Sequence, residues 1–541
     1  MSETSTPISD STTYRKPNMS RCIKFLLQYI LQKYILVAIG VVMTLVILYG
    51  INEIIKLTTI DFPASVCLML IVFFLLSLSS WLKGEDFTEK YFLKYIDIPF
   101  GFNLRWMNLY FTPPFVTLVL ADKVTVQEAF IIAAVFIFGY IIGFAFVGYL
   151  VWGLQVVLGT YDHQKEPSTA GNDSEKEGST NNQSHQEHLS PSLGDSGDSI
   201  VSYEIDPDEF SDVDQGNQLN EGYALSAVST RLSTATAMAA SITNQESQLD
   251  PRYLEKFTLT FDFAVYLLLF IVGLPIYFCT GYEMIVQLAV AVLLFKACLL
   301  PPPKIKKYLH PILVSFSLSL LVYYILSLIK KQNFKQTISN YESGRKYTQL
   351  FNNEQFSKWP GAGDILLSLM DISIVALSLA MYRYRKDLRR YFFALMPVII
   401  VFSFMSLLIY PPLCYHLSIS PERSLGFTGR SVTMALGIPL VHSLGGSEQL
   451  MAVTTILSGI LGVFLGDWIS FTLLRIRKAD FVSRGVTLGV NCGAVSTAHL
   501  LSVDPRAAAM SSLSFTLFGT LMVILAAITP LVKVVRDLVG L

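Results

Sequence analysis

Charged residues are scarce in this sequence, and that scarcity decides its class. Only 15% of the 541 residues are charged and 52% are hydrophobic, with a mean hydropathy of +0.50. Many apolar runs reach the ~20 residues that a bilayer-spanning helix needs. They are continuous rather than alternating, which excludes an outer-membrane barrel. The predicted fold class is therefore all-α, a polytopic helical membrane protein.

Signatures of soluble chemistry are also lacking. The six cysteines are scattered singly, with no C-x-x-C pair and no histidine nearby at metal-ligand spacing. There is no Gly-rich phosphate loop, nucleophile elbow or zincin-type histidine pair. We therefore predict that the protein is not an enzyme and has no cofactor, no metal and no nucleic-acid partner. The N-terminal stretch MSETSTPISDSTTYRKP contains two acids and no apolar core, which is unlike a secretory signal or a typical transit peptide.

The apolar runs fall into two blocks separated by an acidic segment. A polar, basic tail (1–34) precedes a first block of about four helical elements (35–158). The segment 159–256 is rich in Ser and Thr, and its residues 161–250 carry 17 acidic against 3 basic side chains. Such a composition predicts a disordered linker. The second block (257–541) has about nine helical elements.

Basic loops predict how the protein is oriented, because Lys and Arg near helix ends favour the cytosolic side. The densest basic clusters are 304–307, 383–390 and 475–484. If these are cytosolic, both termini and the linker are cytosolic too, provided that 429–446 is a re-entrant hairpin. The polar segment 331–363 is then an extended loop on the opposite side. The identity of the membrane stays open.

Two segments of the second block share the pattern Arg-x-Val-Thr, at Arg430–Thr433 and Arg484–Thr487. The topology brings them in from opposite faces, as inverted repeats of secondary transporters do, with broken helices meeting near the bilayer midplane. Helix N-termini exposed at such breaks favour an anion. The alternative is that both arginines are interfacial and reach the headgroups. The residues predicted to break the helices are Gly437, Pro439 and Gly493.

Two acidic residues interrupt apolar runs, Asp371 and Asp467. Ionisable groups inside a membrane are costly and mark transport pathways or proton relays. Paired with an arginine, each acid is structural, and facing a cavity, each could carry a proton. His499 has the same two alternatives, packing or proton transfer. Gly459, Gly462 and Gly466 lie at near-helical spacing, which predicts close helix packing.

Several motifs identify a family resemblance. From about 257 to 535 the chain resembles the LrgB/CidB-like membrane family, on PGAGDILLSLMDISIVALSLAMYRYRKDLRRY, RSVTMALGIPL, GGSEQLMAVTTILSGILGVFLGDWI and RGVTLGVNCGAVSTAHLL, in that order. The first block, with FPASVCLMLIVFFLLS and WMNLYFTPPFVTLVLADK, resembles the LrgA/CidA-like family. A fusion of both is similar to the plastidic glycolate/glycerate translocators. The resemblance implies export or exchange of small organic acids, and the bacterial members are also described as holin-like regulators.

The resemblance and the residues together give a site hypothesis. We expect a secondary transporter of small monocarboxylates in which the substrate carboxylate binds Arg430. Departures from the family pattern include Asp371, which adds an acid and predicts proton coupling. Hydrogen bonds to the substrate are assigned to Ser431, Thr433, Asn491 and Thr497, and proton coupling to Asp371 and Asp467. Two alternatives stay open, a holin-like oligomeric pore and a membrane scaffold acting through the linker. The expected partners are small organic anions and the lipid bilayer, and a homo-oligomer is possible.

Overall fold

The computed structural model describes residues 26–57, 62–120, 124–159, 251–301, 311–349 and 359–541. Every regular element within these ranges is helical. Nine of the helices described are long and apolar enough to cross a membrane. The predicted all-α polytopic architecture is confirmed. The tail to residue 25 and residues 160–250 of the predicted linker lie outside the described residues.

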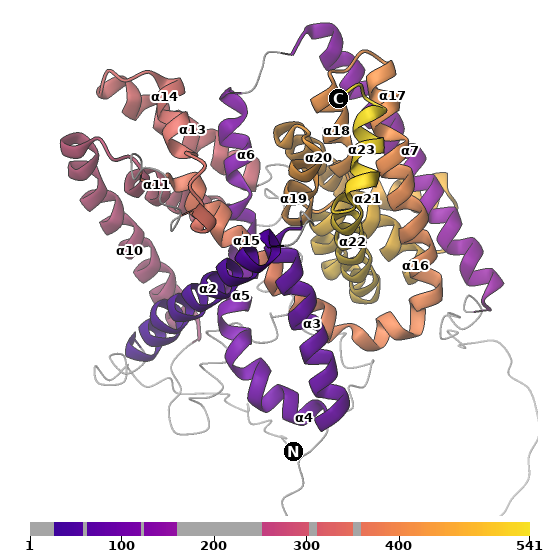
Figure 1. The fold of residues 1–541 in the computed structure, drawn as a ribbon. Helices are drawn as coiled ribbons and strands as arrows, with labels where there is room; N and C mark the ends of the chain where they lie inside the picture. Colours follow the sequence, from indigo (N-terminus) through magenta and orange to yellow (C-terminus); the bar gives the residue numbers. More distant parts are fainter. Residues whose placement is uncertain (1–25, 58–61, 121–123, 160–250, 302–310, 350–358) are drawn as a thin grey trace, which may run out of the picture.

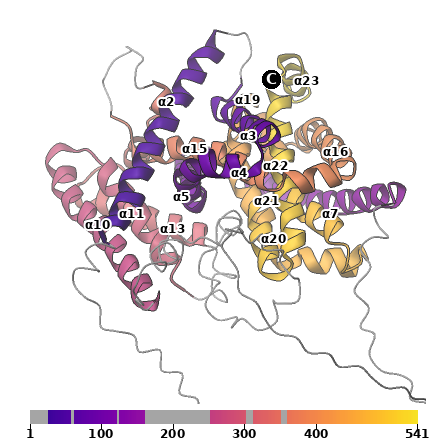
Figure 2. The ribbon, with the colours of Figure 1, turned by 90° about the horizontal axis from the view of Figure 1, so that it is seen from below.

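The N-terminal block is built mainly from four long helices. Its elements are η1 (Leu31–Leu36), α2 (Val37–Lys56), α3 (Ala64–Lys83), α4 (Glu85–Thr88), η2 (Glu89–Leu93), α5 (Lys94–Tyr110), α6 (Thr112–Val116), η3 (Thr117–Leu120) and α7 (Val126–Val157). Both ribbon views place α7 away from the rest of this block, beside the C-terminal helices (Figures 1 and 2).

The C-terminal block begins with three helices that lie beside α2 and α5, and continues with α15 through the middle of the molecule (Figure 1). Its elements are α10 (Pro251–Thr280), α11 (Met284–Cys298), α13 (Pro311–Ile329), α14 (Phe334–Tyr341), η7 (Tyr347–Gln349), α15 (Ala362–Arg383), α16 (Arg385–Leu408), α17 (Tyr410–His416), α18 (Pro421–Gly426), η8 (Phe427–Gly429), α19 (Met434–Leu444), α20 (Glu448–Trp468), η9 (Ile469–Leu473), α21 (Phe481–Val503), α22 (Pro505–Ala526) and α23 (Thr529–Asp537).

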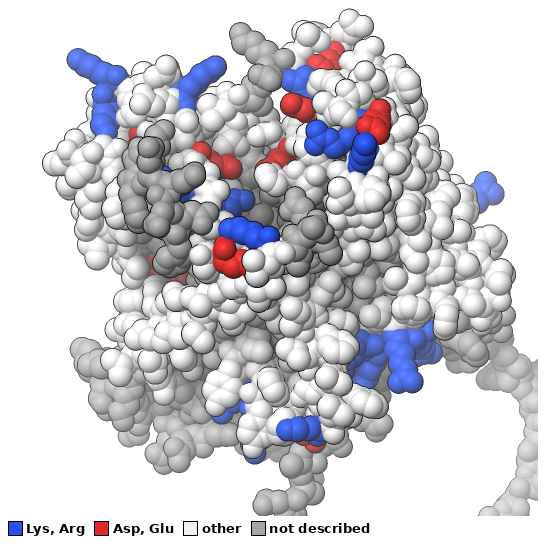
Figure 3. Space-filling view, viewed as in Figure 1, with Lys and Arg blue, Asp and Glu red and all other residues white. Residues whose placement is uncertain are grey.

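Local sequence explains where the long helices begin. Thr125, Ser447, Asp480 and Asp504 each accept a hydrogen bond from a backbone N–H in the first turn of the helix that follows. Such N-caps satisfy donors that the helix itself leaves free. Much of the surface between the helix ends carries no charged side chain (Figure 3). This suits contact with lipid.

The core of the C-terminal block is tightly packed around α21. A Cβ atom added at Gly459, Gly462 or Gly466 on α20 would approach a side chain of α21 to 2.7 Å or less. The prediction that these three glycines allow close helix packing is confirmed. On its other side α21 packs on α22, where a Cβ at Gly485 would lie 2.3 Å from the carbonyl oxygen of Ala507. The backbone of α21 is therefore held between two neighbours.

One expectation about the elements is wrong. The segment 331–363 was expected to be an extended loop, but its described part contains α14 and η7, with Thr337, Ile338, Tyr341 and Tyr347 buried. Asp364 fastens this segment to α15, since its carboxylate accepts hydrogen bonds from Ser343 N and Gly344 N, each at 3.0 Å. These buried aromatics give a polar stretch enough apolar contact to fold. At the end of this block, α22 and α23 are separate helices because the chain is extended at Ile528, just before Thr529 and Pro530.

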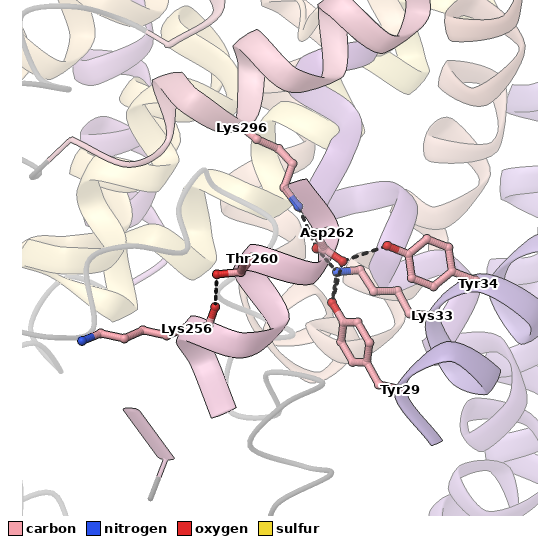
Figure 4. A network of polar contacts seen from close by, with 7 residues as sticks. All are labelled: Tyr29, Lys33, Tyr34, Lys256, Thr260, Asp262 and Lys296. Carbon is pink, nitrogen blue, oxygen red and sulfur yellow. Dashed lines mark hydrogen bonds and ion pairs between the residues drawn. The ribbon is translucent and has the colours of Figure 1, made fainter. Parts of the chain in front are cut away.

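A buried ionic cluster joins the two blocks (Figure 4). The carboxylate of Asp262 on α10 pairs with Lys33 from η1 and with Lys296 from α11. It also accepts hydrogen bonds from the hydroxyls of Tyr29 and Tyr34, at 2.8 and 2.9 Å. One acid of α10 thus gathers four donors from two other segments, residues 29–34 and α11. A multiply bonded, buried carboxylate of this kind fixes relative position more than it adds stability.

Candidate functional site

The segment around Arg430 is a hairpin that enters and leaves on one side. Its inward arm is α18 with η8, its tip is 430–433, and its outward arm is α19. At the base, the backbone N–H of Ser447 donates to the carbonyl oxygen of Glu422 at 2.8 Å. The two arms therefore meet again where they started, in agreement with the re-entrant hairpin assumed for the topology.

The turn of the hairpin lies at other residues than those predicted from the sequence. Arg430 was expected where the segment enters, with helix breaks at Gly437 and Pro439. In the structure Arg430 is at the tip, and α19 runs through both Gly437 and Pro439 without interruption. A proline inside a helix removes one backbone hydrogen bond, and neighbouring segments tolerate that loss inside a membrane protein. The break is the stretch 430–433, which precedes the helix.

Hydroxyl groups of α20 hold the carbonyl groups of this tip. Ser458 Oγ donates to the carbonyl oxygen of Arg430 at 3.1 Å, and Thr455 Oγ1 donates to those of Gly429 and Val432 at 3.0 and 3.3 Å. By contrast, Thr433 makes no side-chain cap at the start of α19. The first-turn N–H groups of α19 therefore present the positive end of the helix at the tip.

The guanidinium of Arg430 is buried and only partly bonded. Arg430 is 1% exposed. Its Nη2 donates to the hydroxyl of Tyr410 at 2.7 Å and to the carbonyl oxygen of Gly139 at 3.0 Å. Nε and Nη1 have no hydrogen-bond partner. A buried cation is costly unless it is paired, so the two free donors favour an anion beside them.

More buried polar atoms without a partner surround the tip. On the two Arg-x-Val-Thr segments and the turn that follows the second, these atoms are Ser431 Oγ, Thr433 Oγ1, Thr487 Oγ1 and Asn491 Oδ1. Buried polar groups are nearly always hydrogen-bonded, so several unpartnered ones at one place indicate a missing partner such as water or a ligand. The tip and the facing part of α21 therefore carry buried polar atoms rather than apolar side chains alone.

The tip and α21 meet at a second helix break. At Gly493 the backbone leaves the helical region, with φ 62° and ψ −146°. A Cβ atom at Gly493 would lie 3.0 Å from Thr433 Oγ1. A Cβ atom at Gly143 on α7 would lie 2.7 Å from Arg430 Nη2 and 2.8 Å from Asn491 Oδ1. The structure therefore brings Arg430, Thr433 and Asn491 together, with the breaks of two helices beside them.

The amide of Asn491 has a defined orientation. Its Nδ2 donates to the carbonyl oxygens of Thr487 and Gly143, at 3.0 and 3.4 Å. An amide is oriented by such a network, so Oδ1 is the atom left toward Arg430. Asn491 Oδ1 thus lies near the engaged Nη2 of Arg430 and has no hydrogen-bond partner of its own.

Thr497 was expected to bond the substrate, but its hydroxyl is already engaged. Thr497 Oγ1 donates to the carbonyl oxygen of Gly493 at 2.9 Å and shares a 2.6 Å hydrogen bond with Ser511 of α22. This places it among the groups that support the break in α21. A direct contact with substrate remains a prediction for Thr497.

The two acids expected to couple protons lie in different surroundings. Asp467 accepts a two-oxygen hydrogen bond from Arg484, with Nη2 at 2.8 and 2.9 Å. That ion pair favours a structural role. Asp371 lies instead within hydrogen-bonding reach of Ser65 and Tyr347, near the charge of Lys346. Neither acid is bonded to Arg430, and a role in proton coupling stays a prediction for both.

Sequence reasoning missed the part of the site that comes from α7. Gly139, Gly143 and Tyr140 of this helix lie at the tip, where the hydroxyl of Tyr140 is 3.3 Å from Cys492 Sγ. The available signal was the small-xxx-small spacing of Gly139 and Gly143, which marks helices that approach closely. Tyr410, which bonds Arg430, follows a long apolar run and gave no signal.

Comparison with known proteins shows which family the second block resembles. Residues 291–531 match the LrgB-like family. The C-terminal block is therefore similar to the LrgB-like family over these residues. The plastidal glycolate/glycerate translocator 1, chloroplastic, of Arabidopsis thaliana is 23% identical over 219 residues, which are 40% of this chain and 40% of that protein. The chain thus spans less than half of the plant relative's length.

Bacterial relatives match parts of the same LrgB-like block. The antiholin-like protein LrgB of Bacillus subtilis is 22% identical over 31% of this chain and 72% of its own length. The holin-like protein CidB of Staphylococcus aureus is 35% identical over 16% of this chain and 37% of its own length. No solved structure matches the chain. The relatives are transporter-like or holin-like membrane proteins, and Arg430, Asn491 and Gly493 all lie inside the LrgB-like segment.

Proposed function

We propose that this protein is a secondary transporter of small organic acids and that it binds their carboxylate at Arg430. The observation that carries the proposal is the buried guanidinium of Arg430, whose Nε and Nη1 lack partners. Nε and Nη1 lie on different edges of the planar guanidinium, and each can donate a charge-assisted hydrogen bond to a carboxylate oxygen. The uncapped start of α19 adds favourable electrostatics for an anion.

The lone acceptor beside Arg430 narrows the substrate class to hydroxy acids. Asn491 Oδ1 is buried and unpartnered, and needs a hydrogen-bond donor. A 2-hydroxy acid offers its carboxylate to Arg430 and its hydroxyl hydrogen to Asn491. Pyruvate has no hydroxyl hydrogen, and sites that bond a substrate hydroxyl discriminate against analogues without it. We therefore rank glycolate, glycerate and lactate above pyruvate. The translocator among the relatives is named for two such acids.

Proton coupling is proposed for Asp371 alone. Its surroundings of hydroxyl groups from Ser65 and Tyr347 suit a group that exchanges a proton. The transporter would then move one acid with one proton, driven by a pH gradient. An Asp371→Asn variant should still bind the acid but lose the response to that gradient.

The second candidate function is a holin-like pore, which the names of the bacterial relatives favour. A pore passes unrelated solutes without saturation, whereas a transporter saturates and discriminates. Both are measured in proteoliposomes holding the purified protein, with labelled glycolate, glycerate, lactate and pyruvate and an imposed pH gradient.

The decisive variant is Arg430→Ala. We expect saturable uptake in the wild type and its loss in the variant, because removing one partner of a buried charged contact costs ~2–5 kcal/mol of binding. Arg389→Ala is the matched control, since Arg389 is exposed on α16. Normal uptake by folded Arg430→Ala protein would refute the assignment, and unsaturable leakage of all four acids would favour the pore.

A further inference from the structure

Glu283, directly before α11, is a buried carboxylate bonded only by neutral groups among the described residues. It is 3% exposed. Its two oxygens accept hydrogen bonds from the amide groups of Gln287, Gln332 and Asn340, at 2.8, 2.9 and 3.3 Å. A buried charge is costly unless it is paired with another charge or bound to a metal ion. The three amides position this carboxylate, but none of them neutralises it.

The cation whose charge acts on Glu283 is Lys330, which follows α13 and is bonded elsewhere. Its Nζ donates to the carbonyl oxygen of Tyr277 at 3.0 Å and lies 4.3 Å from the centre of the Tyr277 ring. Within the described ranges of the chain, Glu283 therefore has no direct ionic partner.

A cavity of about 10 Å³ adjoins this carboxylate, and the residues that line it include Glu283, Gln287 and Thr337. Gln287 and Thr337 are each 2% exposed, and Gln287 Oε1 and Thr337 Oγ1 have no hydrogen-bond partner. Gln332, which bonds the same carboxylate, has a buried and unpartnered Oε1 as well. Such atoms indicate a missing water molecule or ion. A volume of this order holds one water molecule or one small ion.

The chemistry of the lining favours a cation over a water molecule. Carboxylate, amide and hydroxyl oxygens are the ligands that hard cations prefer. A cation bonds all of them at once and supplies the charge that Glu283 lacks, whereas a water molecule leaves the carboxylate uncompensated. One carboxylate balances one positive charge, and the described residues contain no group of three acids, histidines or cysteines that could hold a metal ion. The lining therefore suits a monovalent cation.

We propose that one hard monovalent cation, Na⁺ in size and charge, binds in the cavity between α11, α13 and α14 (Figure 1), with Glu283, Gln287 and Thr337 as ligands. This departs from the sequence-based expectation that the protein has no metal. It goes beyond the proposed transporter function, because the cation site and the Arg430 site are built from different residues. The cation joins α11 to α14 and so fastens part of the polar segment 331–363.

Equilibrium binding of radioactive sodium ions to the purified full chain in detergent tests the site without any organic acid present. Choline chloride keeps the ionic strength constant, and choline is too large for this cavity. Burial raises the pKa of Glu283, so measurement at pH 8 favours the ionised carboxylate. We expect saturable binding that weakens by at least about tenfold in Glu283→Gln and in Thr337→Val, because affinity for hard cations falls with the charge and number of the ligands.

Glu89→Gln is the matched control, since it makes the same chemical change at an exposed carboxylate of η2. It should bind sodium ions as the wild type does. Thermal unfolding checks that each variant is folded, and if Glu283→Gln fails to fold, Thr337→Val still tests the site.

The outcomes are distinct. Wild-type protein without saturable sodium binding overturns the proposal, and the cavity then holds water only. Binding that is unchanged in the folded Glu283→Gln and Thr337→Val variants overturns it too. Binding weakened in these variants and kept in Glu89→Gln supports it. None of these results depends on whether the protein transports an organic acid.

Discussion

Arg430 and Arg484 occupy the same place in the pattern Arg-x-Val-Thr, and their surroundings are opposite. Arg484, 5% exposed, is bonded by two acids, Asp467 from α20 and Asp504 at the cap of α22. Arg430, 1% exposed, bonds a carbonyl oxygen and a tyrosine hydroxyl and keeps two nitrogens unpartnered. The comparison teaches that a shared local motif does not assign a role. The charges brought by other helices do.

The surroundings differ because the two arginines lie at different places in the fold. Arg484 lies in the first turn of α21, where the N-terminal cap of α22 and the end of α20 are both close. Arg430 lies at a hairpin tip, where α7, α17 and α21 meet it with backbone carbonyls, a phenol and an amide. Arg484 is part of a structural contact between helices. Arg430 has unpartnered N–H donors that can bond an anion.

The largest expected effect is the difference in unfolding free energy between alanine variants of the two arginines. Arg484→Ala leaves Asp467 and Asp504 beside each other without their cation, and we expect a loss of about 3 kcal/mol of unfolding free energy. Arg430→Ala removes no ion pair and should cost less than about 1 kcal/mol. Thermal unfolding of both variants in one detergent measures this. Equal losses of unfolding free energy in the two variants would contradict the distinction between a structural Arg484 and an unpaired Arg430.

The second prediction concerns a variant that places a carboxylate beside Arg430. In Asn491→Asp, a side chain of the same size places a carboxylate beside the guanidinium, as Asp467 does for Arg484. We expect saturable acid uptake to fall by at least about tenfold, since an internal carboxylate competes with the substrate for the same donors. The folded fraction should stay close to that of the wild type. Uptake that survives in Asn491→Asp would show that Arg430 does not bind the substrate.

The smallest effect concerns a titratable neighbour of the hairpin base. Burial, together with repulsion from Glu448 at the start of α20, raises the pKa of Glu342 to about 7. Its unfolded value is near 4.3. The folded state therefore binds this proton more tightly, and the protein loses stability as the pH rises from about 4.3 to about 7.

Glu342→Gln should remove this slope and leave the protein more stable above pH 7. Melting temperatures of wild type and variant between about pH 3.5 and 8 measure this slope. The two proteins should converge at the acid end, where Glu342 is protonated in both states. Parallel curves would contradict the assignment. No comparable effect is expected at Arg484, whose partners are held by an arginine that stays charged.

Much of the architecture follows from the sequence because apolar length is a direct signal of a membrane helix. The runs expected from the sequence at 364–382, 391–410 and 449–474 agree with α15, α16 and α20 to within about six residues. The re-entrant hairpin was predicted from charge, since it places the three densest basic clusters on one side together with both termini, although the basic residues of 331–363 then lie on the other. The break near Gly493 followed from its position in a polar stretch.

The rest depended on contacts that no local pattern records. Gly437 and Pro439 lie in an unbroken helix because packing compensates one missing hydrogen bond. Asp467 has its partner Arg484 seventeen residues away on another helix. Gly143 joined the site only through the docking of α7, a tertiary event. The polar segment 331–363 folds because its aromatics find apolar neighbours.

The length of α7 has a consequence for the membrane around the protein. Its 32 residues make a helix of about 48 Å, against a hydrocarbon core about 30 Å thick. Such a helix tilts or deforms the adjacent lipid, and the extent depends on acyl-chain length. Because α7 is bonded near both ends, through Glu128 and Gln155, and holds Arg430 midway through the carbonyl oxygen of Gly139, a thicker or thinner bilayer exerts its mismatch force on the surroundings of Arg430.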